Sequence, residues 1–318
     1  MPTASHAKGI SPTNAVMTAP VDDSATLDAS FRDAVSAIDD GDLPGLERLV
    51  AARPALVRDR LESPGAWLRN QVGGALDGFF ERPYLLWFVA EDPVRNGRLP
   101  GNIAQVAHAI IEAARREGAP TLQEQLDYAL TLVSWSWIAR ECDVQIPLID
   151  ALVDAGAVAD GNPDNALVNG NFAAAEHLVG RGATLTLATA LCLGRWDDVE
   201  RLLPSANDGQ KRFAFVLSAL RGKADALRRM IRDGVDVDAP SADLHSHGTP
   251  LHHAVSSGSL EAVRVLVDAG AALHTRDSAW SGTPLGWAEH YVEESNGKED
   301  GKRFAEIAAY LRARQGDA

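Results

Sequence analysis

The sequence predicts an all-α solenoid of stacked antiparallel helix pairs, and three observations support this fold class. A helix-start signal lies at residues 248–255, where Thr249 can cap the free N–H groups and Pro250 suits the first helical position. One pattern recurs along the chain, in which an apolar residue is followed by apolar residues at +3, +6 and +7 and by glycine at +10. Helices of about ten residues cannot bury both of their apolar faces in each other, so every pair needs neighbours on either side.

The clearest helix pair is predicted between residues 248 and 277. A first helix ends at Val255, and the run Ser256 to Gly258 breaks it. A second helix then begins at Leu260, and Gly270 can supply a left-handed cap at its end.

This stretch carries a short motif. Its residues Thr249, Pro250, Leu251, His252, His253 and Ala254 match T-P-L-H-x-A in full. A second start, GTPLGWA at 282–288, follows at about the period of roughly 33 residues expected for ankyrin repeats, with Gly286 in place of the histidine. The chain therefore resembles the ankyrin-repeat family, in a degenerate form of bacterial type. The resemblance implies that the structural repeat motif consists of Thr249, Pro250, Leu251, His252, Ala254, Gly270, Thr283, Pro284 and Leu285.

Further copies of the second-helix pattern predict about seven or eight repeats. Besides the copy at Leu260, they begin at Leu43, Ile146, Phe172, Trp196 and Ala224. The copies at Leu43 and Trp196 lack the final glycine and run into Pro54 and Pro204. The middle copies follow one another more closely than the roughly 33 residues of an ordinary ankyrin period. We therefore expect the hairpin fingers to be largely lost in the middle, and residues 235–248 are the best candidate for a finger.

The predicted organisation is a disordered N-terminal tail at residues 1–26 followed by one solenoid at 27–318. Met17 is an alternative start that the sequence leaves open. Residues 54–118 form an irregular segment, rich in proline and glycine. Residues 122–140 are predicted as one helix with Trp137 in its core stripe, and Trp196 is also expected in the core.

Composition and charge limit the function classes. The 318 residues carry a formal charge of −14, which would repel a phosphate backbone, so no nucleic-acid partner is expected. No apolar run approaches the ~18 residues of a membrane span, so no membrane partner is expected either. The two cysteines, Cys142 and Cys192, fall in different repeats, which favours reduced thiols and a cytoplasmic location. We expect a monomer.

Each candidate site has a structural alternative. The histidines His245, His247, His252 and His253 form the densest group of potential ligands, but no cysteine or carboxylate completes a closed site, and no metal is expected. No nucleophile elbow, phosphate loop or zinc-protease helix occurs, so no catalytic residue and no cofactor are predicted. In the ankyrin family the first helices and finger tips face the partner, and on that basis Trp135, His253, Trp280 and Trp287 are the predicted partner-binding residues.

The leading hypothesis is a non-catalytic protein–protein interaction module that binds its partner through the concave face. The alternative is a small-molecule-binding protein or enzyme with an aromatic-lined pocket near residues 84–137. A closed pocket of ~300 Å³ or more would favour the alternative, and an open groove would favour a protein partner. A third hypothesis, an acidic inhibitor of a basic partner, fits the charge of −14 but has no motif behind it.

Overall fold

The computed structural model describes residues 23–90, 95–295 and 299–316. Residues 1–22 of the expected tail lie outside this range, and the first helix begins at Asp23, within the region predicted as tail. The helices of the described residues are α1 (Asp23–Asp40), α2 (Leu43–Ala52), α3 (Ala55–Arg58), α4 (Ala66–Val72), η1 (Gly73–Asp77), η2 (Leu85–Ala90), α5 (Ile103–Arg116), α6 (Leu122–Trp135), α7 (Trp137–Glu141), α8 (Gln145–Asp154), α9 (Asn162–Val168), α10 (Phe172–Gly180), α11 (Leu187–Leu193), α12 (Trp196–Leu202), η3 (Leu203–Ser205), α13 (Asp208–Leu220), α14 (Ala224–Arg232), α15 (Pro250–Ser256), α16 (Leu260–Asp268), α17 (Pro284–Glu294) and α18 (Glu299–Gly316).

The helices form successive pairs that stack on one another, which confirms the predicted all-α solenoid. The pairs are α1/α2, η2/α5, α6/α8, α9/α10, α11/α12, α13/α14, α15/α16 and α17/α18, and the short 3-10 helix η2 takes the place of a first helix in the second pair. From α6 onward, each first helix packs on the first helix of the next pair. The buried side chains consequently form one continuous core along the whole described chain.

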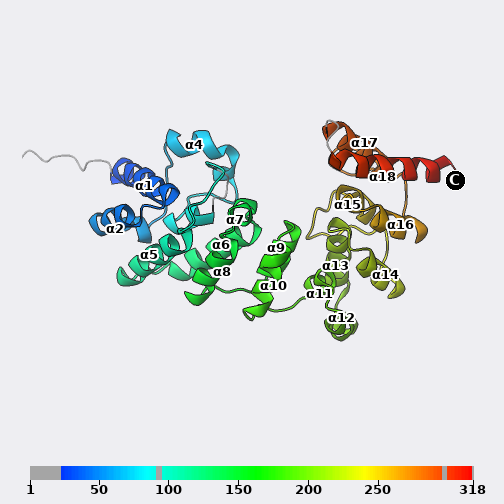
Figure 1. The fold of residues 1–318 in the computed structure, drawn as a ribbon, viewed down its shortest axis with the longest axis horizontal. Helices are drawn as coiled ribbons and strands as arrows, with labels where there is room; N and C mark the ends of the chain where they lie inside the picture. The colour runs from blue at the N-terminus through cyan, green and yellow to red at the C-terminus, as the bar shows by residue number, and fades with distance from the viewer. Residues whose placement is uncertain (1–22, 91–94, 296–298, 317–318) are drawn as a thin grey trace, which may run out of the picture.

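The stack curves into an arch (Figure 1). The first helices α9, α11, α13 and α15 lie on its inner side, and their partners α10, α12, α14 and α16 lie on its outer side. Only residues 181–186 join α10 to α11, whereas residues 233–249 join α14 to α15. The described residues contain no β-strand, and the long linker holds a single isolated bridge between Ser241 and Leu244. Hairpin fingers are therefore absent from the middle repeats, as expected.

Tight turns inside the pairs depend on glycine. Gly41, Gly170, Gly194, Gly222 and Gly258 all have positive φ. Gly222, between α13 and α14, has φ +63°, and a Cβ atom there would lie 2.7 Å from the Cβ of Ser259 in the next repeat. Both the backbone conformation and the approach of the neighbouring repeat therefore require glycine at this position.

Two expectations for the core were wrong. Residues 122–140 do not form one helix, because Ser136 adopts an extended conformation, donates from its hydroxyl to Ala90 O (2.8 Å) and caps α7. The break turns Trp137 outward, leaving it 50% exposed. Trp196 begins α12 and is 42% exposed instead of being buried in the core.

Among the described helices, none is both long and apolar enough to span a membrane.

Replacing Gly222 by alanine should destabilise the stack. The left-handed conformation costs an L-residue about 1–2 kcal/mol, and the contact with Ser259 adds to that cost. Urea denaturation should show a clear loss of stability for Gly222→Ala. The matched control is Gly74→Ala, because Gly74 is not in the left-handed region and a Cβ atom there would meet no other atom within 4 Å. Equal stabilities for the two variants would contradict this explanation.

Candidate functional site

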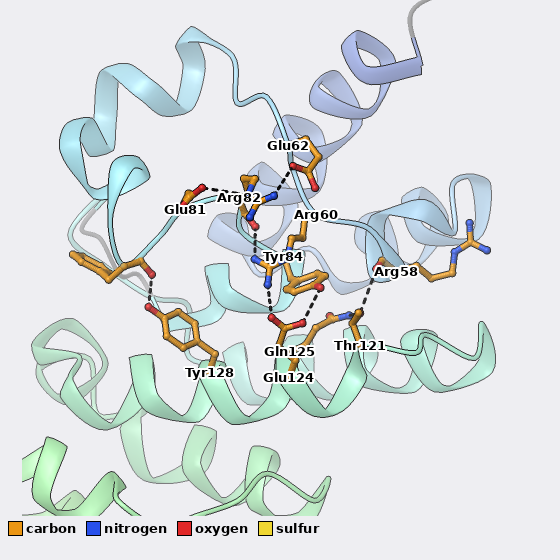
Figure 2. Close-up of polar contacts among 11 residues, drawn as sticks. Arg58, Arg60, Glu62, Glu81, Arg82, Tyr84, Thr121, Glu124, Gln125 and Tyr128 are labelled. Atoms are coloured by element: carbon orange, nitrogen blue, oxygen red, sulfur yellow. Dashed lines mark hydrogen bonds and ion pairs between the residues drawn. The ribbon is translucent and has the colours of Figure 1, made fainter.

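The irregular segment between α3 and η2 is tied to the inner side of α6. Arg60 donates to the carbonyl of Arg82 (3.0 Å) and pairs with the carboxylate of Glu124 on α6. The hydroxyl of Tyr84 donates to the other oxygen of the same carboxylate at 3.1 Å. Figure 2 shows these groups converging on Glu124 from the chain above the helix. The guanidinium of Arg60 also lies over the Tyr84 ring, 4.3 Å from its centre.

A second tie lies further along the same face of α6. The hydroxyl of Tyr128 donates to the carbonyl of Phe79 (Figure 2). The Phe79 ring meets Trp135 edge to face, with ring centres 5.4 Å apart. Trp135, a predicted partner-binding residue, is therefore partly covered by the protein's own chain. We call residues 59–84 the strap, because they cover the inner face of α6.

The aromatic residues of this region fill the space that the alternative hypothesis assigned to a pocket. Phe80, Tyr84, Trp87 and Phe88 are buried. Their rings contact one another in edge and tilted arrangements, and Trp87 packs on Tyr128 with ring centres 4.4 Å apart. Mutual packing of this kind contributes to stability and occupies the volume that a ligand would need.

At the other end of the arch, the predicted repeat motif links two successive repeats. The backbone N–H and the hydroxyl of Thr249 both donate to Nδ1 of His252, at 3.2 and 2.8 Å. Nε2 must then carry the proton, and it donates to the carbonyl of Gly282 (3.1 Å). Burial lowers the pKa of His252, which favours the neutral ring, and the hydrogen bonds to Thr249 and Gly282 select this tautomer.

The linker between α16 and α17 is shaped by one buried carboxylate. Asp277 Oδ1 accepts from the N–H groups of Ala279 and Trp280, and Oδ2 accepts from the N–H of Gly282 and the indole of Trp287. Burial alone would raise the pKa of Asp277, but these hydrogen bonds outweigh burial and lower it to about 2. The loop is therefore held in one shape by a carboxylate that stays charged.

This loop presents the most exposed large apolar side chain of the described residues. Trp280 is 71% exposed. Its ring contacts His247 and Trp287, with ring centres 5.0 and 5.8 Å apart. His253 lies behind them and is only 2% exposed, so this predicted binding residue supports the surface instead of lining it. Trp287 is half-buried and likewise supports Trp280. We call Trp280, Trp287 and His247 the aromatic platform.

Comparison with known proteins identifies the family. A sequence model of ankyrin repeats in three copies matches residues 165–277. The cyclin-dependent kinase 4 inhibitor B of Rattus norvegicus is 31% identical over 144 residues, which is 44% of this chain and the whole length of that protein. The chain belongs to the ankyrin-repeat family.

Two other matches are partial or distant. The potassium channel GORK of Arabidopsis thaliana is 35% identical over 65 residues, which is 20% of this chain and only 7% of the channel's length. The human ASB11 ankyrin repeat domain is 19% identical, with a TM-score of 0.30 over 64% of this chain and 94% of that domain.

Three histidines at or near the aromatic platform form a group through ring contacts and a hydrogen bond. The ring centres of His245, His247 and His253 are 5.9–6.0 Å from one another. Nε2 of His253 is committed to the carbonyl of His245 at 3.2 Å. Within residues 23–90, 95–295 and 299–316, no three potential ligands are arranged to hold a metal ion. Burial, aided by the neighbouring His245, lowers the pKa of His253 to about 4.

Cys192 shows no sign of nucleophilic activation. Cys192 is buried, and desolvation raises the pKa of its thiol to about 12. The reactive thiolate is therefore disfavoured at neutral pH.

Several residues that hold these ankyrin repeats together were not identified from the sequence. Glu124 and Arg60 are far apart in the chain, and nothing in the sequence indicates that they pair. Asp277 has a local signal, because an aspartate at the start of a short Ser- and Gly-rich loop favours hydrogen bonds to the N–H groups that follow.

Removing Glu124 should release the strap without unfolding the repeats. In Glu124→Ala, Arg60 and Tyr84 lose their shared acceptor, so amide hydrogen exchange within residues 59–84 should become about tenfold faster or more. Exchange in α13 to α16 should not change. The control is Glu117→Ala, at the exposed end of α5. Unchanged exchange in the strap would show that these ties do not hold it.

His253 should make stability depend on pH. Its pKa is about 4 in the folded chain and ~6.5 when unfolded, so the unfolded chain binds more protons between these values. The contribution of neutral His253 to the free energy of unfolding is fully present above pH ~6.5. It is lost as the pH falls towards 4, and the loss is on the order of 3 kcal/mol.

The measurement is the unfolding free energy as a function of pH. His253→Gln, which cannot titrate, should show a flatter profile between pH 6.5 and 4 than the unmodified protein. His290→Gln is the control, since the His290 side chain is 70% exposed. Parallel profiles for the unmodified protein and His253→Gln would contradict the assignment.

Proposed function

We propose that this chain is a non-catalytic protein-interaction module that binds a protein partner through the inner face of its C-terminal repeats, from α9 to α17. The observation that carries the proposal is the exposed Trp280 on a loop held in one shape by Asp277. Tryptophan anchors with rigid support are frequent hot spots of protein interfaces. A loop already held in its bound shape loses little conformational entropy on binding.

The two halves of the inner face differ in how accessible they are to a partner. The strap covers α6 through Glu124 and Tyr128, so the N-terminal half already has an occupant. The long linkers that follow α14 and α16 are joined to each other, because Ser278 N–H donates to the carbonyl of His247 (2.9 Å) and Ala272 N–H donates to Asp238 (2.9 Å). They form one supported surface around the aromatic platform.

The comparisons support a protein as the partner. Ankyrin repeats are generally protein-interaction modules, and solenoids bind through their extended concave surface. The name of the rat relative describes an inhibitor of a kinase, which is itself a protein. The formal charge of −14 favours a neutral or cationic partner over nucleic acid. We also propose that the protein acts as a monomer and that it acts in the cytoplasm. The two free cysteines are in keeping with a cytoplasmic location.

No specific observation favours the alternative of an aromatic-lined pocket near residues 84–137. The rings that would line it are buried against one another. The charged groups nearby, Arg60 and Glu124, are engaged with each other.

Affinity capture with matched tryptophan variants tests the proposal. The full chain, Trp280→Ala and Trp196→Ala serve as baits in an extract of the source cells, and bound proteins are quantified by mass spectrometry. Trp196 is the control because it is also exposed but belongs to α12, on the outer side of the arch (Figure 1). The same partner should be recovered with the full chain and Trp196→Ala, and its yield should fall at least about tenfold with Trp280→Ala. Equal recovery with Trp280→Ala would contradict the proposed surface.

A further inference from the structure

A groove of about 540 Å³ lies where the missing fingers would be, at the N-terminal ends of the first helices α11 and α13. Its walls include the short connection at residues 184–188, the partly buried side chains of Leu202 and Phe213, and Asp243 from the long linker after α14. The groove exists because short turns join the middle repeats while the next repeat has a long linker that reaches beside them.

Asp164, on the first turn of α9, lies in the wall of this groove. The hydroxyls of Thr186 and Thr189 both donate to its Oδ1, at 2.7 and 2.6 Å. This leaves Oδ2 without a donor in the described part of the chain. Burial raises the pKa of Asp164 despite these two hydrogen bonds, so its environment lacks a compensating positive charge.

The charged side chains that line the groove are all acidic. Asp164 and Asp243 line it, and no basic side chain does. Lys211 is the first basic residue of α13, and it is paired with Asp233 at 2.8 Å. The N-terminal ends of α11 and α13 contribute partial positive charges of about half an elementary charge each, which two full carboxylates outweigh.

We infer that this groove binds a lysine or arginine side chain of a peptide segment in the protein partner. The aliphatic part of that side chain lies along Leu185 and Phe213, and its charged end donates to Asp164 Oδ2 with Asp243 nearby. Long basic side chains suit such a site because an apolar stem carries a charged head. The occupant is a peptide and not a free small molecule, because the groove is open and its wall includes Asp243, which lies on the same linker as His247 of the aromatic platform. This inference rests on the proposed function and names the chemistry of the partner.

A phage-displayed library of random dodecapeptides, selected on the full chain, tests the inference. The enriched peptides should carry lysine or arginine next to an aliphatic residue. Their dissociation constants are then measured by fluorescence anisotropy for the unmodified chain, Asp164→Asn, Asp243→Asn and Trp280→Ala. The control is Asp154→Asn, because Asp154 is exposed and paired with Arg181 on another part of the surface.

Asp164→Asn should weaken binding about tenfold or more, the usual contribution of a hydrogen bond to a charged group. Asp243→Asn removes a nearby negative charge and should weaken binding by a smaller factor that still exceeds about twofold. Asp154→Asn should stay within about twofold. Replacing the basic residue of the peptide by alanine should remove the difference between the unmodified chain and the two groove variants. Asp243 lies on an exposed loop, so its variant tests the groove even if Asp164→Asn fails to fold.

The outcomes separate the groove from the proposed function. Enriched peptides without a basic residue, or affinities unchanged in both groove variants, would overturn the inference. If those peptides still lose binding in Trp280→Ala, the proposed surface stands and only the groove assignment falls. A library that yields no binder would also overturn the groove assignment, and the capture experiment with Trp280→Ala would still decide the proposed function.

Discussion

The structure depends on burial shared between neighbouring repeats. Short helices such as α9, α11 and α15 cannot form a core in isolation, and each first helix buries its apolar side chains against the next. Every departure from the regular repeat must therefore be covered by something else. Where α6 lacks a normal neighbour on its inner side, the strap covers it, and Asp28 on α1 holds the start of α4 through the N–H of Gly65 and the indole of Trp67, both at 2.8 Å.

Polar groups fix how the C-terminal repeats are arranged. Neutral His252 accepts from Thr249 and donates to the loop of the next repeat, so one imidazole sets the spacing of two repeats. Charged Asp277 then shapes that loop and orients Trp287 beneath Trp280. The loop that carries Trp280 is consequently exposed and held in one shape, whereas α6 is covered by the protein's own chain. This difference is the basis of the proposed binding mode.

The helices were predictable because their signals are local. Apolar spacing, glycine at helix ends and the T-P-L-H-x-A motif predicted the helix pairs of residues 146–291, and the short spacing between copies predicted the loss of fingers in the middle. The break at Ser136 was not predictable, since it depends on a hydrogen bond to Ala90, which is distant in sequence. The same holds for the pairing of Arg60 with Glu124 and for the position of Asp164 in a groove, because both arise only when separate repeats meet. The predicted partner-binding residues remain predictions, with Trp280 the most exposed of them.

Hydrogen exchange, measured on the chain alone and in complex with its captured partner, can decide where the partner binds. We expect slower exchange in residues 184–210 and 235–291 on binding, with exchange in the strap and α6 unchanged. Faster exchange in residues 59–84 together with protection of α6 would contradict this expectation, because the partner would then displace the strap and occupy the N-terminal half of the inner face.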